Sequence, residues 1–307
     1  MQQIHITEEN KIYAFSPYAQ PIAHVAPGET VQVFTWDCFS GRLTDNCQVP
    51  SQTIYPYGNP QTGPIYIEGA EAGDTLAVDI LAIDPVQDWA VSAHLLHGGG
   101  LEPQEDYYIT GEPIPERVFI YKFDGKEYRY NDRLHFPWEP FLGTIATAPA
   151  LEVVSASHPF RNGGNLDCPV MKPGNRVYLP VSVKGAYFYT GDCHVRQGHG
   201  EACAVAMETA CKATLRFELI KDKRTAWPRV ENETEMICIG VAAPMEQAAR
   251  LAYSSLIRWM VELGWDKYEA YQAVTMAGRL WVGSLVSREY TMIAAIDKEI
   301  VDRACVQ

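Results

Sequence analysis

The chain has 307 residues, of which 47% are hydrophobic and 21% are charged, and its formal net charge is −13. This length is enough to bury a large core and lies near the size at which one core divides into subdomains. The acidic balance argues against the clustered Lys and Arg residues that bind nucleic acid or an anionic membrane surface. We therefore expect a globular protein with neither kind of partner.

The sequence shows no targeting or membrane-spanning segment. It contains no run of about eighteen apolar residues, and its start, MQQIHITEENKIYAFS, lacks the basic and apolar regions of a signal peptide. The eight cysteines are scattered without a CxxC pair, so they do not form a zinc-finger pattern. We expect a cytoplasmic protein whose thiols are reduced.

The first part of the chain predicts strands. Residues 30–38, TVQVFTWDC, alternate between apolar and polar positions, and Asp37 ends the run as either a metal ligand or a turn-capping acid. Residues 65–68 and 75–83 are separated by a glycine-containing turn, which predicts a hairpin. Residues 118–129 predict another hairpin, with Asp-Gly as its turn.

Two histidines precede a triple glycine. His94 and His97 lie three residues apart in VSAHLLHGGGL, but the glycines make a helix that would align them improbable. The loop lacks the spacing of a nucleotide-binding motif. His97 remains a candidate for the substrate pocket.

The stretch GDCHVRQGHGE at 191–201 carries the densest polar chemistry of the chain. The alternation in 176–189 predicts a strand that leads into it. If the strand continues, Asp192 and His194 project from the same face, which is how a metal site is made. We expect the stretch to form the turn of a hairpin, with Glu201 at the start of the second arm.

Cys193 lies inside this stretch and needs a separate interpretation. As a nucleophile it would require a neighbouring base, for which His194 or His199 is available. Because alternation turns Cys193 away from Asp192 and His194, we expect it to belong to the core.

The rest of the chain adds a second polar loop and two helices. The loop at 157–169 contains Asn165 and Asp167, which are candidates for the substrate pocket. Apolar residues at three-four spacing predict a helix over 244–263, and Asp266 with Glu269 begins a second helix as a capping box. The fold class is mainly β, with sandwich-like or barrel-like sheets and a C-terminal α+β portion containing two consecutive helices.

Composition divides the chain into three approximate and interleaved ranges. Residues 1–155 form an N-terminal β-rich part, 156–240 form a central β part with the polar stretch, and 241–307 form the C-terminal α+β part.

Several long motifs resemble those of the acetamidase/formamidase family. They are TWDCFSG, GPIYIEGAEAGDTLAVDIL, PFLGTIATAPA, NGGNLD and YLPVSVKGAYFYTGDCHVRQGHGEACAVAMET, and they run almost from end to end. The resemblance implies hydrolysis of a short primary amide to a carboxylate and ammonia, a mainly β fold and a homo-oligomer, a dimer or larger. Two positions depart from the usual pattern, His199 and the sequence LLHGGG ahead of residue 101.

Amide chemistry suggests roles for the candidate residues. The carbonyl must be polarised, the attacking water activated and the leaving nitrogen protonated. A divalent metal held by Asp37, Asp192 and His194 would supply the first two, and mixed carboxylate and imidazole ligands suit zinc better than calcium. Glu201 and His199 are the candidate catalytic residues, with Glu201 as the general base.

Two other functions remain open. One is a hydrolase with a covalent nucleophile on the same scaffold. The other is a relative without catalytic activity that binds a metal or a small polar ligand.

Overall fold

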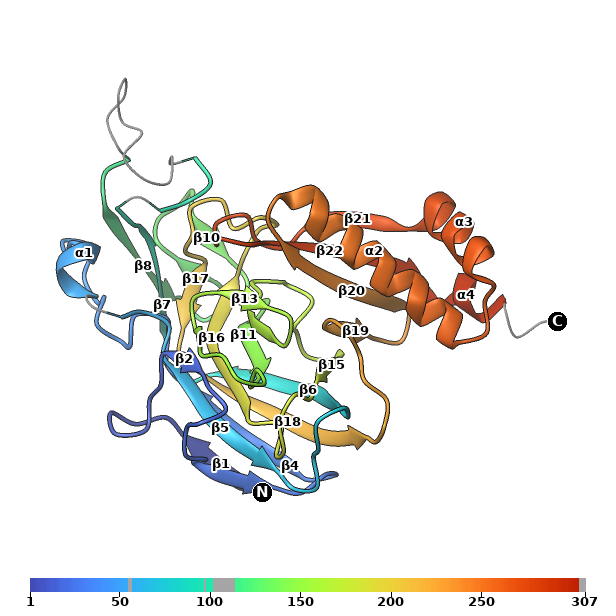
Figure 1. The fold of residues 1–307 in the computed structure, drawn as a ribbon. Coiled ribbons are helices and arrows are strands. Elements are labelled where there is room, and N and C mark those ends of the chain that lie inside the picture. Colours follow the sequence, from blue (N-terminus) through green and yellow to red (C-terminus); the bar gives the residue numbers. More distant parts are fainter. Residues whose placement is uncertain (55–56, 97, 102–113, 304–307) are drawn as a thin grey trace.

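The computed structural model describes residues 1–54, 57–96, 98–101 and 114–303. Strands dominate it, and the helices gather at the C-terminal end, as Figure 1 shows. The predicted fold class, mainly β with a C-terminal portion that contains two consecutive helices, is confirmed. No helix in the described ranges is long and apolar enough to cross a membrane.

The first large sheet has nine strands, in the order β1-β4-β18-β6-β15-β19-β20-β22-β21. It takes strands from all three of the ranges 1–155, 156–240 and 241–307. In the same order, its strands are Gln2–His5, Thr30–Thr35, Cys211–Ile220, Thr75–Pro85, Arg176–Pro180, Arg229–Glu231, Glu235–Ala242, Tyr290–Asp297 and Arg279–Val282.

The second large sheet has eleven strands. Its main path is β10-β9-β8-β7-β17-β16-β11-β14-β13, and β5 joins it by pairing with both β16 and β3. Along the path the strands are His135–Phe136, Tyr128–Arg129, Arg117–Phe123, Trp89–His94, Met207–Thr209, Phe188–Arg196, Phe141–Thr147, Gly163–Asn165 and Pro159–Phe160, followed by Gln61–Ile67 and Ala23–Val25 for β5 and β3. A further pair joins β12, Val154–Ser155, to β2, Ala14–Phe15.

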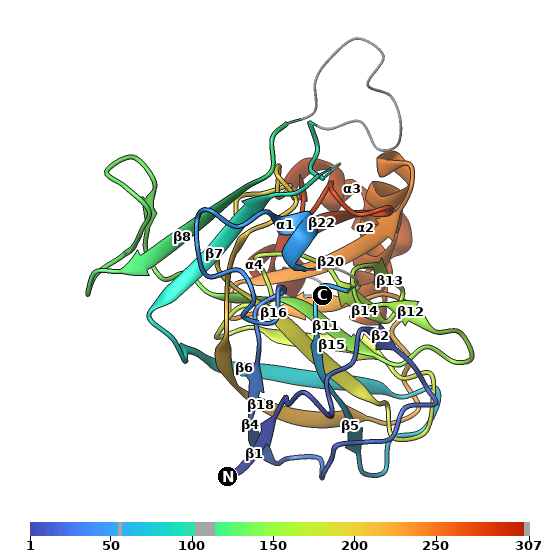
Figure 2. The same cartoon turned by 90° about the vertical axis from the view of Figure 1, so that its left-hand side faces the viewer.

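The two sheets share one core. A single apolar cluster joins side chains such as Val33, Val78 and Phe217 of the nine-stranded sheet to Leu142 and Phe188 of the eleven-stranded sheet. Figure 2 shows β6 and β18 below β11 and β16 in the side view. Strands β11 and β16 are buried along nearly their whole length, so a polar side chain on them has to find its partner inside the protein.

The C-terminal helices pack against β20 and β22, near one edge of the nine-stranded sheet. Helix α2, Met245–Glu262, packs on β20 and β22, and α3, Lys267–Ala277, packs against α2 (Figure 1). The predicted cap is present, because the Asp266 carboxylate accepts hydrogen bonds from the backbone N–H groups of Tyr268 and Glu269. Two short helices complete the fold, α1 at Pro50–Thr53 and α4 at Lys298–Val301.

Two local predictions were wrong. Residues 176–189 do not form one strand, because β15 ends at Pro180 and the backbone then passes through positive φ at Gly185, Ala186 and Tyr187. Strands β5 and β6 are not a hairpin but belong to different sheets. In contrast, β8 and β9 form the predicted antiparallel hairpin around Gly125.

Candidate active site

A cluster of acids surrounds one histidine inside the eleven-stranded sheet. His194 on β16 is fully buried, and Glu208 on β17 lies opposite it in the strand register. The Nε2 atom of His194 lies 3.1 Å from Glu208 Oε1 and 3.5 Å from Asp192 Oδ2. The predicted convergence of Asp192 and His194 is therefore present, although Asp192 adopts a positive φ of 58° rather than a regular strand conformation.

The neighbouring strand leaves room for this cluster by carrying a glycine. Gly143 lies on β11, between two residues that pair with Cys193 and Gly191 of β16. A methyl group on Gly143 would lie 2.6 Å from Asp192 Oδ2, 2.8 Å from His194 Nε2 and 2.9 Å from Asp167 Oδ1. Three donor atoms thus converge on the space that a side chain at residue 143 would fill, which we call the Gly143 cradle.

Asp167 reaches the cradle from the loop after β14. Its Oδ2 atom accepts a hydrogen bond of 2.6 Å from the Asn165 side chain, and its Oδ1 atom, which is buried, has no hydrogen-bond partner. Asn165 is held in turn by Thr144 and Asn59. Asn165 and Asp167, two of the three residues predicted for the substrate pocket, therefore act together, because Asn165 orients Asp167 toward the cradle.

Glu201 approaches from the loop between β16 and β17. Backbone hydrogen bonds at Gly200 tie this loop to Gly283 and Leu285, and the Ser284 hydroxyl donates to Glu201 Oε2 at 3.2 Å. The sequence predicted Glu201 at the start of the second arm of a hairpin. Glu201 instead lies in the loop, because the second arm becomes a strand only at Met207. Its φ is positive, so the backbone turns at the point where the carboxylate enters the cluster.

Burial and mutual charge set the ionisation of the cluster. Burial raises the pKa of Glu201 to about 6 and raises the pKa values of Asp167 and Glu208 well above their usual range. Burial lowers the pKa of the His194 imidazole, but the adjacent Glu208 and Asp192 carboxylates outweigh this and raise it well above its usual range. Burial opposes ionisation of Asp192, yet contact with His194 lowers the pKa of that carboxyl.

The cluster has the donor atoms of a cation site. Two groups of three side chains have ligand atoms within 4.8 Å of one another, Asp167 with His194 and Glu201, and Cys38 with Asp192 and Glu208. The buried His194 Nε2 and Nδ1 atoms and Glu208 Oε2 have no hydrogen-bond partner. Buried polar atoms are rarely left without partners, and several carboxylates gathered on one imidazole are the arrangement that a bound cation would satisfy.

The other predicted site residues lie around this centre. Asp37 is buried after β4, and its Oδ1 atom accepts hydrogen bonds from the backbone N–H groups of Phe39 and Gly41, which is the turn-capping alternative. His199 is exposed and stacks on Trp281, with ring centroids 6.0 Å apart. His97 lies outside the described residues.

A cavity of about 450 Å³ opens beside the cluster. Glu201 and His199 both line it, together with apolar side chains that include Tyr121, Phe136 and Met207. Glu201 is the cluster residue that the cavity and the donor groups share. A small molecule in the cavity can therefore approach the cluster from the side of Glu201.

Comparison with known proteins shows which family the chain belongs to. The model of the Acetamidase/Formamidase family matches residues 2–158 and 142–287. The chain belongs to the acetamidase/formamidase family.

Solved structures of acetamidases have the same fold. An acetamidase from Yersinia enterocolitica superposes with a TM-score of 0.92 at 36% sequence identity, over 97% of this chain and 93% of that one. An acetamidase from Bacillus halodurans superposes with a TM-score of 0.90 at 29% identity, over 98% and 99% of the two chains.

The chain matches only part of the length of its curated relatives in the acetamidase/formamidase family. The formamidase of Methylophilus methylotrophus is 27% identical over 259 residues, which is 66% of this chain and 62% of that protein. Across three such relatives, the chain spans 53% to 64% of their length.

Three residues of the candidate site were not predicted from the sequence. Glu208 was visible in the alternating run that follows the polar stretch, but its register opposite His194 depends on where β17 begins. Cys38 directly follows Asp37, and Gly143 lies in the stretch PFLG. Cys193 lies in the core, as predicted, and burial raises the pKa of its thiol well above its usual range.

Proposed function

We propose that the protein hydrolyses a short primary amide to a carboxylate and ammonia at the cluster beside the Gly143 cradle. The observation that carries this proposal is the position of Glu201, which lines the cavity and also belongs to a group of metal-ligating atoms. Membership of the acetamidase/formamidase family supports amides as the substrate class. The apolar walls of the cavity suit the acyl side of the substrate.

We further propose that Asp167, Asp192 and His194 hold a divalent cation at the cradle. Their donor atoms converge on one point, and two of these atoms, Asp167 Oδ1 and His194 Nε2, make no hydrogen bond, although Nε2 lies 3.1 Å from Glu208 Oε1. A set that mixes imidazole and carboxylate suits zinc, whereas calcium prefers oxygen ligands alone. Such an ion would polarise the amide carbonyl and lower the pKa of water.

The protein's own groups move the protons in this proposal. Glu201, whose pKa is raised by burial to about 6, takes a proton from the attacking water as the water oxygen bonds to the carbonyl carbon. The same carboxyl then gives that proton to the amide nitrogen as the carbon–nitrogen bond breaks, so that ammonia leaves. The Ser284 hydroxyl fixes the orientation of Glu201 by its hydrogen bond to Oε2.

Asp37 and His199, which the sequence predicted as a metal ligand and a catalytic residue, have other roles in this proposal. Asp37 stays a candidate ligand, although its backbone hydrogen bonds favour a role in shaping the turn that carries Cys38. His199 stands on the wall of the cavity, where it would contact the substrate rather than the cation.

Ammonia release from a series of amides, measured with and without a chelator, tests the proposal. We expect turnover of formamide, acetamide and propionamide that is lost after chelation and restored by zinc. Turnover that survives chelation would refute the cation while leaving amide hydrolysis intact. If zinc-loaded protein released no ammonia from any of these amides, the proposed hydrolase activity would be refuted.

A further inference from the structure

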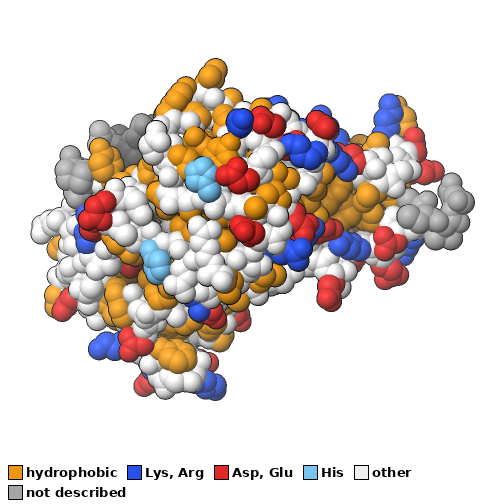
Figure 3. Space-filling model, turned by 90° about the horizontal axis from the view of Figure 1, so that it is seen from below, with side chains coloured by type: hydrophobic (Ala, Val, Ile, Leu, Met, Phe, Trp, Pro, Cys, Tyr) orange, Lys and Arg blue, Asp and Glu red, His pale blue; other side chains and the backbone are white. Residues whose placement is uncertain are grey.

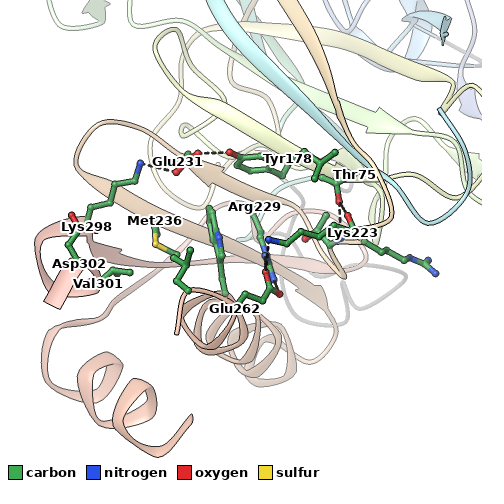
Figure 4. A pocket seen from close by; sticks show the side chains of 15 residues that line it. Thr75, Tyr178, Lys223, Arg229, Glu231, Met236, Glu262, Lys298, Val301 and Asp302 are labelled. Carbon is green, nitrogen blue, oxygen red and sulfur yellow. Dashed lines mark hydrogen bonds and ion pairs between the residues drawn. The ribbon is translucent and has the colours of Figure 1, made fainter. Parts of the chain in front are cut away.

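A second cavity lies away from the amide site, on the C-terminal side of the nine-stranded sheet. Its volume is about 390 Å³, and its walls come from β15, β19 and β20, the end of α2, and α4 (Figure 4). It shares no lining residue with the cavity beside Glu201. From below, Figure 3 shows apolar surface on this side, with Lys, Arg and acidic side chains around it. The size is that of an ordinary small-molecule site.

The acidic groups on two of its walls already have partners. Arg229, whose side chain is 8% exposed, donates two hydrogen bonds to the Glu262 carboxylate, at 2.7 and 2.8 Å. Glu231 accepts a hydrogen bond from the Tyr178 hydroxyl and pairs with Lys298 at 2.8 Å (Figure 4). These carboxylates therefore have little capacity left for a cationic ligand.

Cationic side chains in the wall of this cavity, in contrast, have capacity left to bind an anionic ligand. Arg229 Nε is buried and has no acceptor. Lys223 Nζ lies 3.9 Å from Glu262 Oε2, a distance too long for a hydrogen bond, and Arg224 also lines the cavity. Four cationic and three acidic side chains line the cavity in a chain whose net charge is −13. A ligand with one negative charge balances this site, whereas a dianion would meet excess repulsion from the acids.

The remaining wall is aromatic and apolar. The Trp259 ring packs edge-on against Tyr178, with centroids 5.8 Å apart, and the Arg229 guanidinium lies 5.1 Å from the Trp259 ring centroid. Met236 and Val301 add aliphatic surface. Flat apolar groups pack well against such a wall, and a cavity of this size far exceeds what an inorganic anion fills.

We propose that this cavity is a second binding site, which takes a small organic monocarboxylate with a flat apolar body. The carboxylate of the ligand pairs with Lys223 and Arg224 at the mouth, and its body packs against Trp259 and Tyr178. This proposal does not depend on the amide chemistry, because none of these residues belongs to the cluster beside Gly143.

Binding of 4-fluorobenzoate to the full chain, followed by fluorine NMR, tests the proposal. We expect saturable binding to the unmodified protein and an affinity at least tenfold weaker in the Lys223→Met/Arg224→Met double variant. Glu262→Gln removes one negative charge from the wall and should tighten binding. The neutral analogue 4-fluorobenzamide should lose this binding mode, and it is compared in Glu201→Gln protein so that turnover cannot remove it.

An unchanged affinity for 4-fluorobenzoate in the double variant, with the fold verified by circular dichroism, would overturn the proposal. If binding were then also lost in Gly143→Ala, the carboxylate would occupy the amide site instead. Binding that does not saturate would also overturn the proposal, because the probe would then only partition onto the apolar surface.

Discussion

Gly143 is the residue on which the geometry of the proposed amide site depends most closely. Its lack of a side chain lets Asp167, Asp192 and His194 bring their donor atoms to one point. The requirement is spatial rather than conformational, because Gly143 does not have a positive φ. Any larger residue would place carbon where the donor atoms converge.

We therefore expect Gly143→Ala to reduce turnover by about 100-fold or more, because displacement of reacting groups by about 1 Å has effects of that size. Zinc content, measured by mass spectrometry, should fall with the activity. Gly58→Ala is the matched control, since its methyl group would make only an ordinary contact of 3.4 Å with the Cys38 carbonyl oxygen. Full activity and full zinc content in Gly143→Ala would contradict the cradle.

At the same scale, the sequence predicted some site residues and missed others for physical reasons. Asp192 and His194 are two positions apart on a strand, so their shared face follows from local geometry. Glu208 reaches His194 only through the pairing of β16 with β17, across a loop whose length cannot be read from alternation. The space at Gly143 arises from three segments that meet in the folded chain.

At the scale of elements, a partly buried ion pair adds to the apolar packing that holds α2 on the sheet. Arg229 on β19 holds Glu262 at the last turn of α2 with two hydrogen bonds. These hydrogen bonds lower the pKa of Glu262, although its burial acts in the opposite direction. Because the folded pKa lies below the ordinary value of 4.5, the pair stabilises the fold above that pH and stops doing so as the pH falls through the folded pKa.

Glu262→Gln should lower the free energy of unfolding by roughly 1–3 kcal/mol at pH 7, less than a fully buried pair because the Glu262 side chain is 34% exposed. The difference from the unmodified protein should shrink as the pH falls below about 4. Urea unfolding at pH 7 and at a pH below about 4 measures this difference in the free energy of unfolding. Glu71→Gln, in an exposed pair with Lys184, should change stability by less than about 0.5 kcal/mol. An equal loss for Glu262→Gln at both pH values would contradict the ion-pair explanation.

The elements also show where sequence patterns are informative. Helices α2 and α3 follow from three-four spacing and the Asp266 cap, because helical contacts are local. The proposed hairpin of residues 65–83 failed because alternation predicts a strand but does not name its partner. Strand β6 pairs with β18, whose residues come more than a hundred positions later in the chain.

At the scale of the whole molecule, the eleven-stranded sheet and the loops beside it bury a concentration of acidic side chains. Asp167, Asp192, Glu201 and Glu208 are all buried close to a single imidazole. Buried carboxylates repel one another when ionised, so an ion bound at the cradle would stabilise the folded state relative to the unfolded chain.

Zinc at about 100 times its dissociation constant should add about 2.7 kcal/mol to the free energy of unfolding. For a protein of 307 residues, that corresponds to a rise in Tm of roughly 4 °C. Differential scanning calorimetry of chelator-treated and zinc-loaded protein measures the rise, and Gly143→Ala protein should lack it. An identical Tm with and without zinc would contradict a cation site at the Gly143 cradle.

In the proposed mechanism, Glu201 carries the proton from water to the leaving nitrogen. The most direct test is the rate of ammonia release from acetamide by Glu201→Gln, measured on protein whose zinc content matches that of the unmodified enzyme. The proposed mechanism predicts a fall of about 100-fold or more, because the amide of glutamine has no basic site to accept the proton. Undiminished ammonia release by Glu201→Gln would contradict it.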